Sequence, residues 1–173
     1  QVNGGMDVKY GINQAFTLDV TLIPDFGQVQ SDNRVLNLTP YEVKFNENRP
    51  FFTEGTELFN KSGLFYSRRI GNTPSHYYDV QSMVEDNNQY ELIRNPTVTQ
   101  LYNGIKFSGR TRKKLGIGIF NAITAPMRAE LYDRYNRKDT FINTEPLANY
   151  NIIVLDQALR GRSSITLTNT NVQ

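Results

Sequence analysis

The feature that most constrains this chain is the strict alternation of apolar and polar residues in several short segments. In residues 16–22, four apolar side chains alternate with Thr17, Asp19 and Thr21. A period of two is the pattern of a β-strand with one apolar and one polar face. Residues 115–123 alternate in the same way, with glycine and alanine opposite the aliphatic side chains. The sequence therefore predicts an antiparallel, all-β fold.

Other segments extend this pattern along the chain. Short basic turns at residues 111–114 and 159–162 each join two predicted strands into a hairpin. The stretches 71–96 and 125–148 are rich in turn-forming or charged residues and are interpreted as long loops. Short turns on one side and long polar loops on the other are typical of outer-membrane β-barrels. The further predicted strands are 7–12, 65–70, 105–110, 150–155 and 163–170.

Residues 24–59 break the alternation. They begin with a turn-type cluster and then mix charged residues with phenylalanines. This stretch is too aromatic for a disordered linker and too long for a simple surface loop. We therefore expect a compact insert with short helical turns. The expected division is 1–23 for the first barrel strands, 24–64 for an insert in the lumen or periplasm, and 65–173 for further barrel strands with long polar loops.

The composition excludes several other classes of protein. No run approaches the ~18–20 apolar residues that a membrane-spanning helix needs, and the mean hydropathy is −0.52. A net charge of +2, with basic and acidic residues interspersed, gives no nucleic-acid footprint. The absence of cysteine from the chain excludes disulfides and zinc–thiolate sites. The alternation itself leaves two folds open, a membrane β-barrel and a soluble β-sandwich with one dry and one wet face.

A dense series of short sequences favours the barrel. It includes DVKYGI at 7–12, PDFGQV at 24–29, NRPFF at 48–52 and FYSRRIG at 65–71. The series resembles a family of large outer-membrane proteins of the Bacteroidota. Their C-terminal barrel region is described as a domain of unknown function, and it usually follows a module similar to a family-nine carbohydrate-binding domain. The resemblance implies an outer-membrane location and a transmembrane antiparallel β-barrel, and it carries no known activity. It is close over 7–71, extends to 105–170, and departs in detail at Ile23, Gln30 and Asn48.

Charged side chains are concentrated, among aromatic residues, in and just after the insert. Carboxylates and arginines beside aromatic rings suit the binding of sugars or peptides, inside or at the mouth of a barrel. The alternative is that these charges pair with one another and hold the insert in a polar lumen. Glycoside hydrolysis would need two carboxyl groups about 5–10 Å apart, for which the sequence gives no geometry. The candidate binding residues are Asp25, Asp32, Glu42, Glu47, Arg49, Glu54, Glu57, Arg68 and Arg69.

Other motifs predict no catalytic, metal or cofactor site. His76 lies in a polar segment and is interpreted as a solvated loop histidine. Residues 86–88 have the side chains of a calcium loop but lack its turn glycine. Gly116 and Gly118 lack the third glycine of a nucleotide-binding fingerprint, and we expect them to allow close packing against a strand.

We therefore predict a non-enzymatic segment of an outer-membrane β-barrel that serves transport or assembly at the cell surface, alone or as a subunit of a larger complex. The expected partners are outer-membrane lipid, a glycan or peptide cargo, and other outer-membrane proteins. The alternatives are a soluble all-β glycan-binding module and, after it, a glycoside hydrolase. Because a barrel needs at least about eight strands, we expect the chain to be part of a longer polypeptide.

Overall fold

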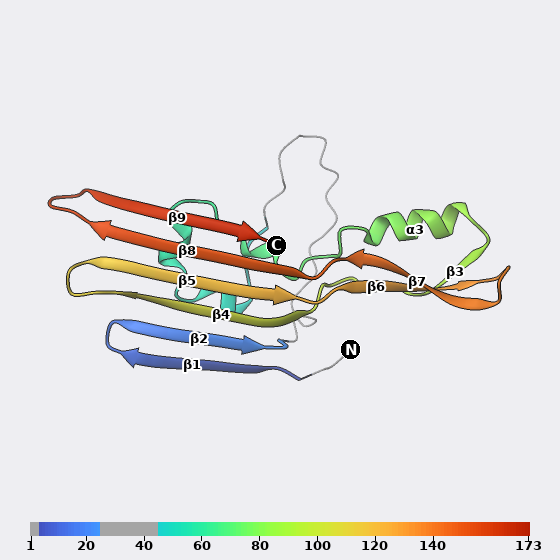
Figure 1. Cartoon of the computed structure of the whole chain (residues 1–173), viewed down its shortest axis with the longest axis horizontal. Helices are drawn as coiled ribbons and strands as arrows, with labels where there is room; N and C mark the ends of the chain where they lie inside the picture. Colours follow the sequence, from blue (N-terminus) through green and yellow to red (C-terminus); the bar gives the residue numbers. More distant parts are fainter. Residues whose placement is uncertain (1–3, 25–44) are drawn as a thin grey trace.

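The computed structural model describes residues 4–24 and 45–173, and its main body is an open six-stranded antiparallel sheet (Figure 1). The order of the strands in the sheet is the order of the chain, so the sheet is an up-and-down meander with two excursions. The predicted antiparallel all-β fold is confirmed, although both sheets in the described residues are open. The strands of the large sheet are β1 (Met6–Asn13), β2 (Phe16–Leu22), β4 (Leu101–Arg110), β5 (Leu115–Thr124), β8 (Ala148–Ala158) and β9 (Ser164–Val172).

The connections between these strands differ at the two ends of the sheet. The hairpins β1–β2, β4–β5 and β8–β9 all turn at one end, on the left in Figure 1. The long connections, from β2 to β4 and from β5 to β8, leave from the opposite end. The predicted hairpin across residues 111–114 is confirmed, as Arg110 pairs with Gly116.

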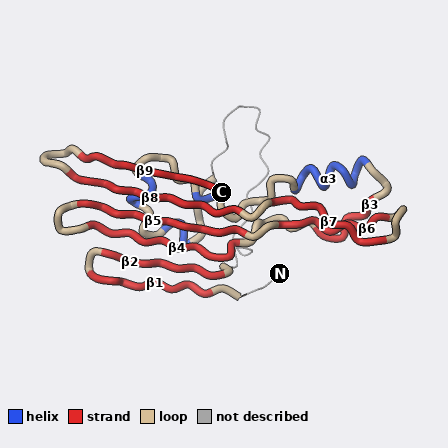
Figure 2. Tube along the Cα trace, in the orientation of Figure 1, coloured by secondary structure: helices blue, strands red, loops and turns tan. Residues whose placement is uncertain are grey.

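The two excursions together form a second, smaller sheet. The β6–β7 hairpin prolongs β5 and β8 beyond the large sheet, and β3 pairs with β6 (Figure 2). Helix α3 packs on this sheet, with Val80 buried against Ala129 and Leu131. These elements, which we call the distal lobe, are α3 (Tyr77–Asp86), β3 (Tyr90–Arg94), β6 (Met127–Asp133) and β7 (Lys138–Glu145).

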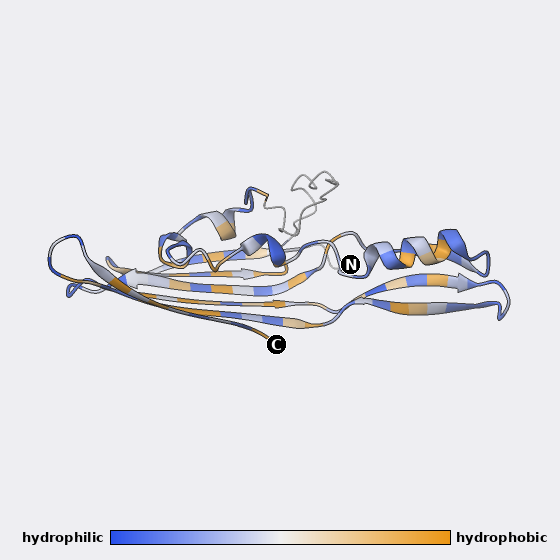
Figure 3. Ribbon diagram, turned by 90° about the horizontal axis from the view of Figure 1, so that it is seen from above, coloured by the Kyte–Doolittle hydropathy of each residue, from blue (hydrophilic) through white to orange (hydrophobic). Residues whose placement is uncertain are grey.

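The segment 45–70, which we call the insert, lies on one face of the large sheet, as Figure 3 shows. It contains α1 (Pro50–Thr53), α2 (Glu57–Asn60) and the 3-10 turn η1 (Ser67–Arg69). Phe52 and Phe59 of the insert pack on Phe120 of β5 and form the centre of the main core. Gly118 makes room for this contact, because a Cβ there would lie 3.1 Å from the Phe59 ring. The expectation of a compact insert with short helical turns is confirmed for residues 45–59.

Three predicted elements were wrong. Residues 65–70 are no strand but contain η1, whose carbonyls are held by a buried arginine. The predicted loop 71–96 contains α3 and β3, because the apolar residues of α3 recur at helical spacing and pack on the smaller sheet. The predicted loop 125–148 is the β6–β7 hairpin, because Ala129 and Leu131, at alternate positions of β6, are buried in the core of the distal lobe, and Asp133 is buried on the same face.

Candidate functional site

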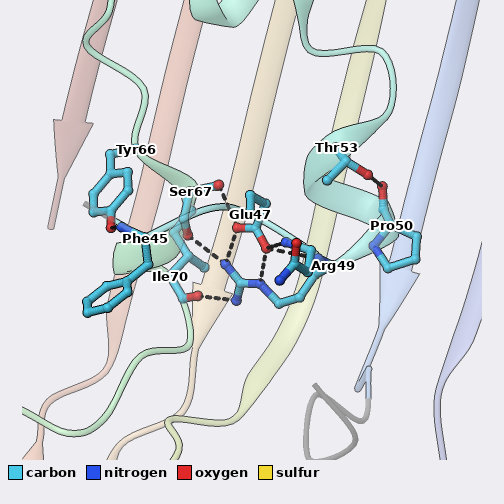
Figure 4. A network of polar contacts seen from close by, with 9 residues as sticks. Phe45, Glu47, Arg49, Pro50, Thr53, Tyr66, Ser67 and Ile70 are labelled. Atoms are coloured by element: carbon cyan, nitrogen blue, oxygen red, sulfur yellow. Dashed lines mark hydrogen bonds and ion pairs between the residues drawn. The ribbon is translucent and has the colours of Figure 1, made fainter. Parts of the chain in front are cut away.

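Arg49 fixes the start of the insert from a nearly buried position, with 3% of its surface exposed. Its guanidinium donates hydrogen bonds to both carboxylate oxygens of Glu47, and to the backbone carbonyls of Ser67 and Ile70 at 2.9 and 2.6 Å (Figure 4). It also lies 4.2 Å from the centre of the Phe52 ring. We call this group the arginine clamp. The clamp ties α1 to η1, and it donates hydrogen bonds to backbone carbonyls at η1 that a short helical turn does not fully satisfy.

Glu47 completes the arginine clamp and is itself held as a carboxylate. Burial on its own would raise its pKa, but hydrogen bonds from Arg49 and Ser67, with the positive charge of Arg49, lower the pKa below its usual value of 4.5. The Ser67 hydroxyl donates to Glu47 at 2.6 Å. All the hydrogen bonds that the structure gives this carboxylate come from residues of the insert, and its role is therefore structural.

Lys106 of β4 joins the large sheet to α1. Its side chain is 2% exposed, and its ammonium donates to the backbone carbonyls of Phe51, at 2.7 Å, and Glu54. The carboxylate of Asp19, on the neighbouring strand β2, lies 3.3 Å away. This lysine anchor caps the C-terminal end of α1, where helix carbonyls lack partners and favour a cation.

Asp156 of β8 joins the large sheet to α2. Here the sheet supplies the negative charge and the insert supplies the positive one. It is fully buried and accepts from Lys61 at 2.7 Å, from Thr166 at 2.8 Å and from Arg110. Lys61 follows α2 directly, so this aspartate anchor fixes the C-terminal end of α2. The sequence reasoning missed both anchors. The available signal was a charged residue on an otherwise uncharged stretch of one strand face: Lys106 between Gly104 and Ser108, and Asp156 after Ile152 and Val154.

The structure describes six of the nine candidate binding residues and places them in different parts of the insert. Glu47 and Arg49 contact each other as an ion pair. Glu54 is 60% exposed and pairs at 2.7 Å with Lys9, while Glu57 lines a shallow pocket with Lys61. Arg69 is exposed and stacks over the ring of Tyr66, and Arg68 is half-buried. Asp25, Asp32 and Glu42 lie outside the described residues.

A pocket of about 220 Å³ opens beside the lysine anchor at the β1 edge of the large sheet. Lys9, Asp19, Glu54 and Lys106 line it, and they form two opposite-charge pairs. Within residues 4–24 and 45–173, no three His, Cys, Asp or Glu side chains come close enough to hold a metal ion. His76 precedes α3, is 60% exposed and lies 2.8 Å from Asp79, which agrees with a solvated histidine.

The two faces of the large sheet differ completely in charge. All the charged side chains of its strands lie on the face that carries the insert: Asp7, Lys9, Asp19, Lys106, Arg110 and Asp156. The opposite face, which we call the bare face, is covered by no element of the described chain (Figure 3). Eight of its apolar side chains are 37 to 64% exposed: Met6, Val8, Tyr10, Ile105, Ile119, Ile153, Ile165 and Leu167.

The fold and these contacts define a class of protein: an open antiparallel sheet with a helical insert anchored on its polar face and an uncovered apolar face behind it. The chain belongs to the family described as "Domain of unknown function (DUF5916)", whose model matches residues 1–173. The predicted membership of a domain family of unknown function is thus confirmed. Neither the search of curated proteins nor that of solved structures finds a match. In the described residues, no helix has the length and apolar character needed to cross a membrane.

Proposed function

We propose that the large sheet is a section of the wall of a transmembrane β-barrel, with the bare face toward lipid and the insert in the lumen. The observation that carries this proposal is the segregation of charge. None of the strand residues on the bare face is charged, although six charged residues lie on the other face of the same strands. A soluble sheet exposes its polar face to water and covers its apolar one. Here the arrangement is inverted, as it is in barrels surrounded by lipid.

The lengths of the strands support the same proposal. β4, β5, β8 and β9 contain 10, 10, 11 and 9 residues, and a strand that crosses a bilayer at a tilt needs about 9–11. The short hairpin turns lie together at one end and the long connections at the other. We assign the turns to the periplasmic side and the distal lobe to the cell surface, as in outer-membrane barrels.

The edges of the large sheet indicate what completes the barrel. β1 is exposed along its whole length, β9 along almost all of it, and each pairs with one strand only in the described residues. Long unpaired edges are open to pairing with further strands. Six strands are too few to close a barrel, which needs at least about eight. We propose that further strands of the natural polypeptide pair with β1 and β9.

The insert determines what such a barrel could do. The lysine and aspartate anchors hold it against the lumenal face by buried polar contacts, and the arginine clamp ties its own segments together. A rigid insert of this kind would narrow the lumen and limit what passes. The proposed function is therefore transport or assembly at the bacterial cell surface, with a glycan or peptide cargo or with other outer-membrane proteins as partners, and without catalysis. The upstream carbohydrate-binding module implied by the resemblance would suit this role.

The test is the behaviour of the natural polypeptide in membranes of the producing cells. We expect it to be several times longer than 173 residues, to stay in the membrane pellet through an alkaline carbonate wash, and to need detergent for extraction. A protein of ~20 kDa that is released by the wash and stays monodisperse in plain buffer would refute the barrel. A soluble glycan-binding module would then be the better account.

A further inference from the structure

Most side chains of the bare face are apolar, but asparagines gather at one corner, around Ile123 of β5. Asn121 donates to the side-chain oxygens of Asn149 and Asn151, at 2.7 and 2.8 Å, and Asn151 donates to Asn171 at 3.2 Å. These residues lie near the end of the large sheet from which the long connections leave. With Asn103 and Asn169 on the same face, they form what we call the asparagine patch.

The border between the asparagine patch and the apolar surface runs obliquely across the strands. On β4 the first apolar residue after the patch is Ile105, and on β9 it is Leu167. The register places Ile105 level with Asn121, Asn151 and Asn171, so the border on β9 is shifted by four residues toward the hairpin turns. On β5 and β8 the border takes the intermediate position, before Ile119 and Ile153, and Ile123 of β5 lies inside the patch, between Asn103 and Asn149.

The slope of this border follows from the dimensions of a sheet. Four residues of antiparallel strand span about 14 Å, and the three strand spacings from β4 to β9 also span about 14 Å. The border therefore crosses the strands at about 45°. The strands of transmembrane barrels are tilted from the barrel axis by about 35–45°. An apolar band that is level in the membrane must cross its own tilted strands at just such an angle.

We infer that the asparagine patch marks the headgroup level of the outer leaflet, and that the strands cross the bilayer at about 45° to its normal. This inference rests on the barrel proposed above. The primary amides suit polar lipid headgroups and interfacial water, because each offers both donors and an acceptor. A protein partner is less consistent with the geometry. A docking site for a protein would have a closed outline, whereas this patch ends along a straight oblique border. The ligand class is thus the zwitterionic or anionic lipid headgroup.

The test compares the depths of three positions. The chain contains no cysteine, so the variants Ile105→Cys, Leu167→Cys and Asn171→Cys each present one thiol in this segment. Each is introduced into the natural polypeptide, labelled with a nitroxide and reconstituted into phosphatidylcholine vesicles. The relative access of oxygen and of a water-soluble nickel chelate then gives the depth of each label.

The tilted arrangement predicts equal depths for Ile105→Cys and Leu167→Cys, and a label about 10 Å shallower at Asn171→Cys. Equal depths for Ile105→Cys and Asn171→Cys, which share one row of the sheet, would overturn the tilt and leave the barrel standing. A label at Ile105→Cys that meets only the aqueous reagent would overturn the barrel itself. A label at Asn171→Cys shielded from both reagents would overturn the headgroup assignment in favour of a protein contact.

Discussion

A single charge placed in the middle of the bare face should reveal which solvent that face meets. Leu18 of β2 lies in the middle row of the face, between Tyr10 of β1 and Phe107 of β4. The substitution Leu18→Arg adds a cation on the side of the sheet where the described strands carry none. Its aliphatic stem fits the pleated surface, so the change tests the surroundings more than the packing.

The expected cost depends on the solvent. Arginine on the lipid face of a barrel costs about 2–4 kcal/mol near the middle of the bilayer and about 0–1 kcal/mol near its surface. In water, a partly exposed position of this kind costs about 1 kcal/mol or less. The barrel proposal therefore predicts a loss of about 30-fold to several hundred-fold in the ratio of folded to unfolded protein.

The assay is guanidinium unfolding of the natural polypeptide in phosphatidylcholine vesicles, followed by the loss of β-sheet circular dichroism. Tyr135→Arg is the matched control, because Tyr135 lies in the β6–β7 turn of the distal lobe and is 79% exposed. We expect the control to stay within about 0.5 kcal/mol of the unmodified protein. If Leu18→Arg costs no more than the control, the bare face does not lie against lipid and the reasoning fails.

Three further changes test the insert and its anchors. Glu47→Gln should lower stability by about 1–3 kcal/mol at neutral pH. Because the pKa of Glu47 is lowered in the folded protein, its contribution is present above pH 4.5 and lost as the pH falls through the lower folded value, so this variant should show a weaker acid dependence. Gly104→Ala should cost about 1–3 kcal/mol, because its Cβ would lie 2.7 Å from the ring of Phe51, whereas Gly11→Ala meets nothing within 4 Å and should cost little. Phe59→Ala should cost about 3–5 kcal/mol and expose the insert to proteases, because Phe59 is fully buried at the centre of the main core.

Each of these three predictions has an outcome that would contradict it. An unchanged acid-unfolding profile for Glu47→Gln, measured by circular dichroism between pH 3 and 7, would show that the arginine clamp does not depend on this carboxylate. Equal denaturation midpoints for Gly104→Ala and Gly11→Ala would show that α1 does not pack closely on β4. Limited proteolysis that leaves residues 45–70 intact in Phe59→Ala would show that the polar anchors hold the insert without its core.

Local alternation in the sequence determined most of the large sheet. All six of its strands were predicted, because a period of two appears wherever one strand face meets a single environment. The same alternation placed Gly116 and Gly118 opposite the aliphatic residues of β5, and the structure uses that space for Leu58 and Phe59 of the insert. The sequence also predicted a structured insert, since its aromatic content requires burial.

Tertiary structure alone decided how charges pair and which face is bare. Lys106 and Asp156 each meet partners 45 or more residues away, and local sequence contains no information about such distances. Arg49 could not be distinguished from Arg68 or Arg69 by pattern, because its burial depends on the approach of η1. The distal lobe was missed for a related reason: its helix and hairpin bury few apolar residues, and only their mutual packing distinguishes them from loops. Alternation shows that the two faces of a strand differ, whereas the position of the insert decides which of them is left for another partner.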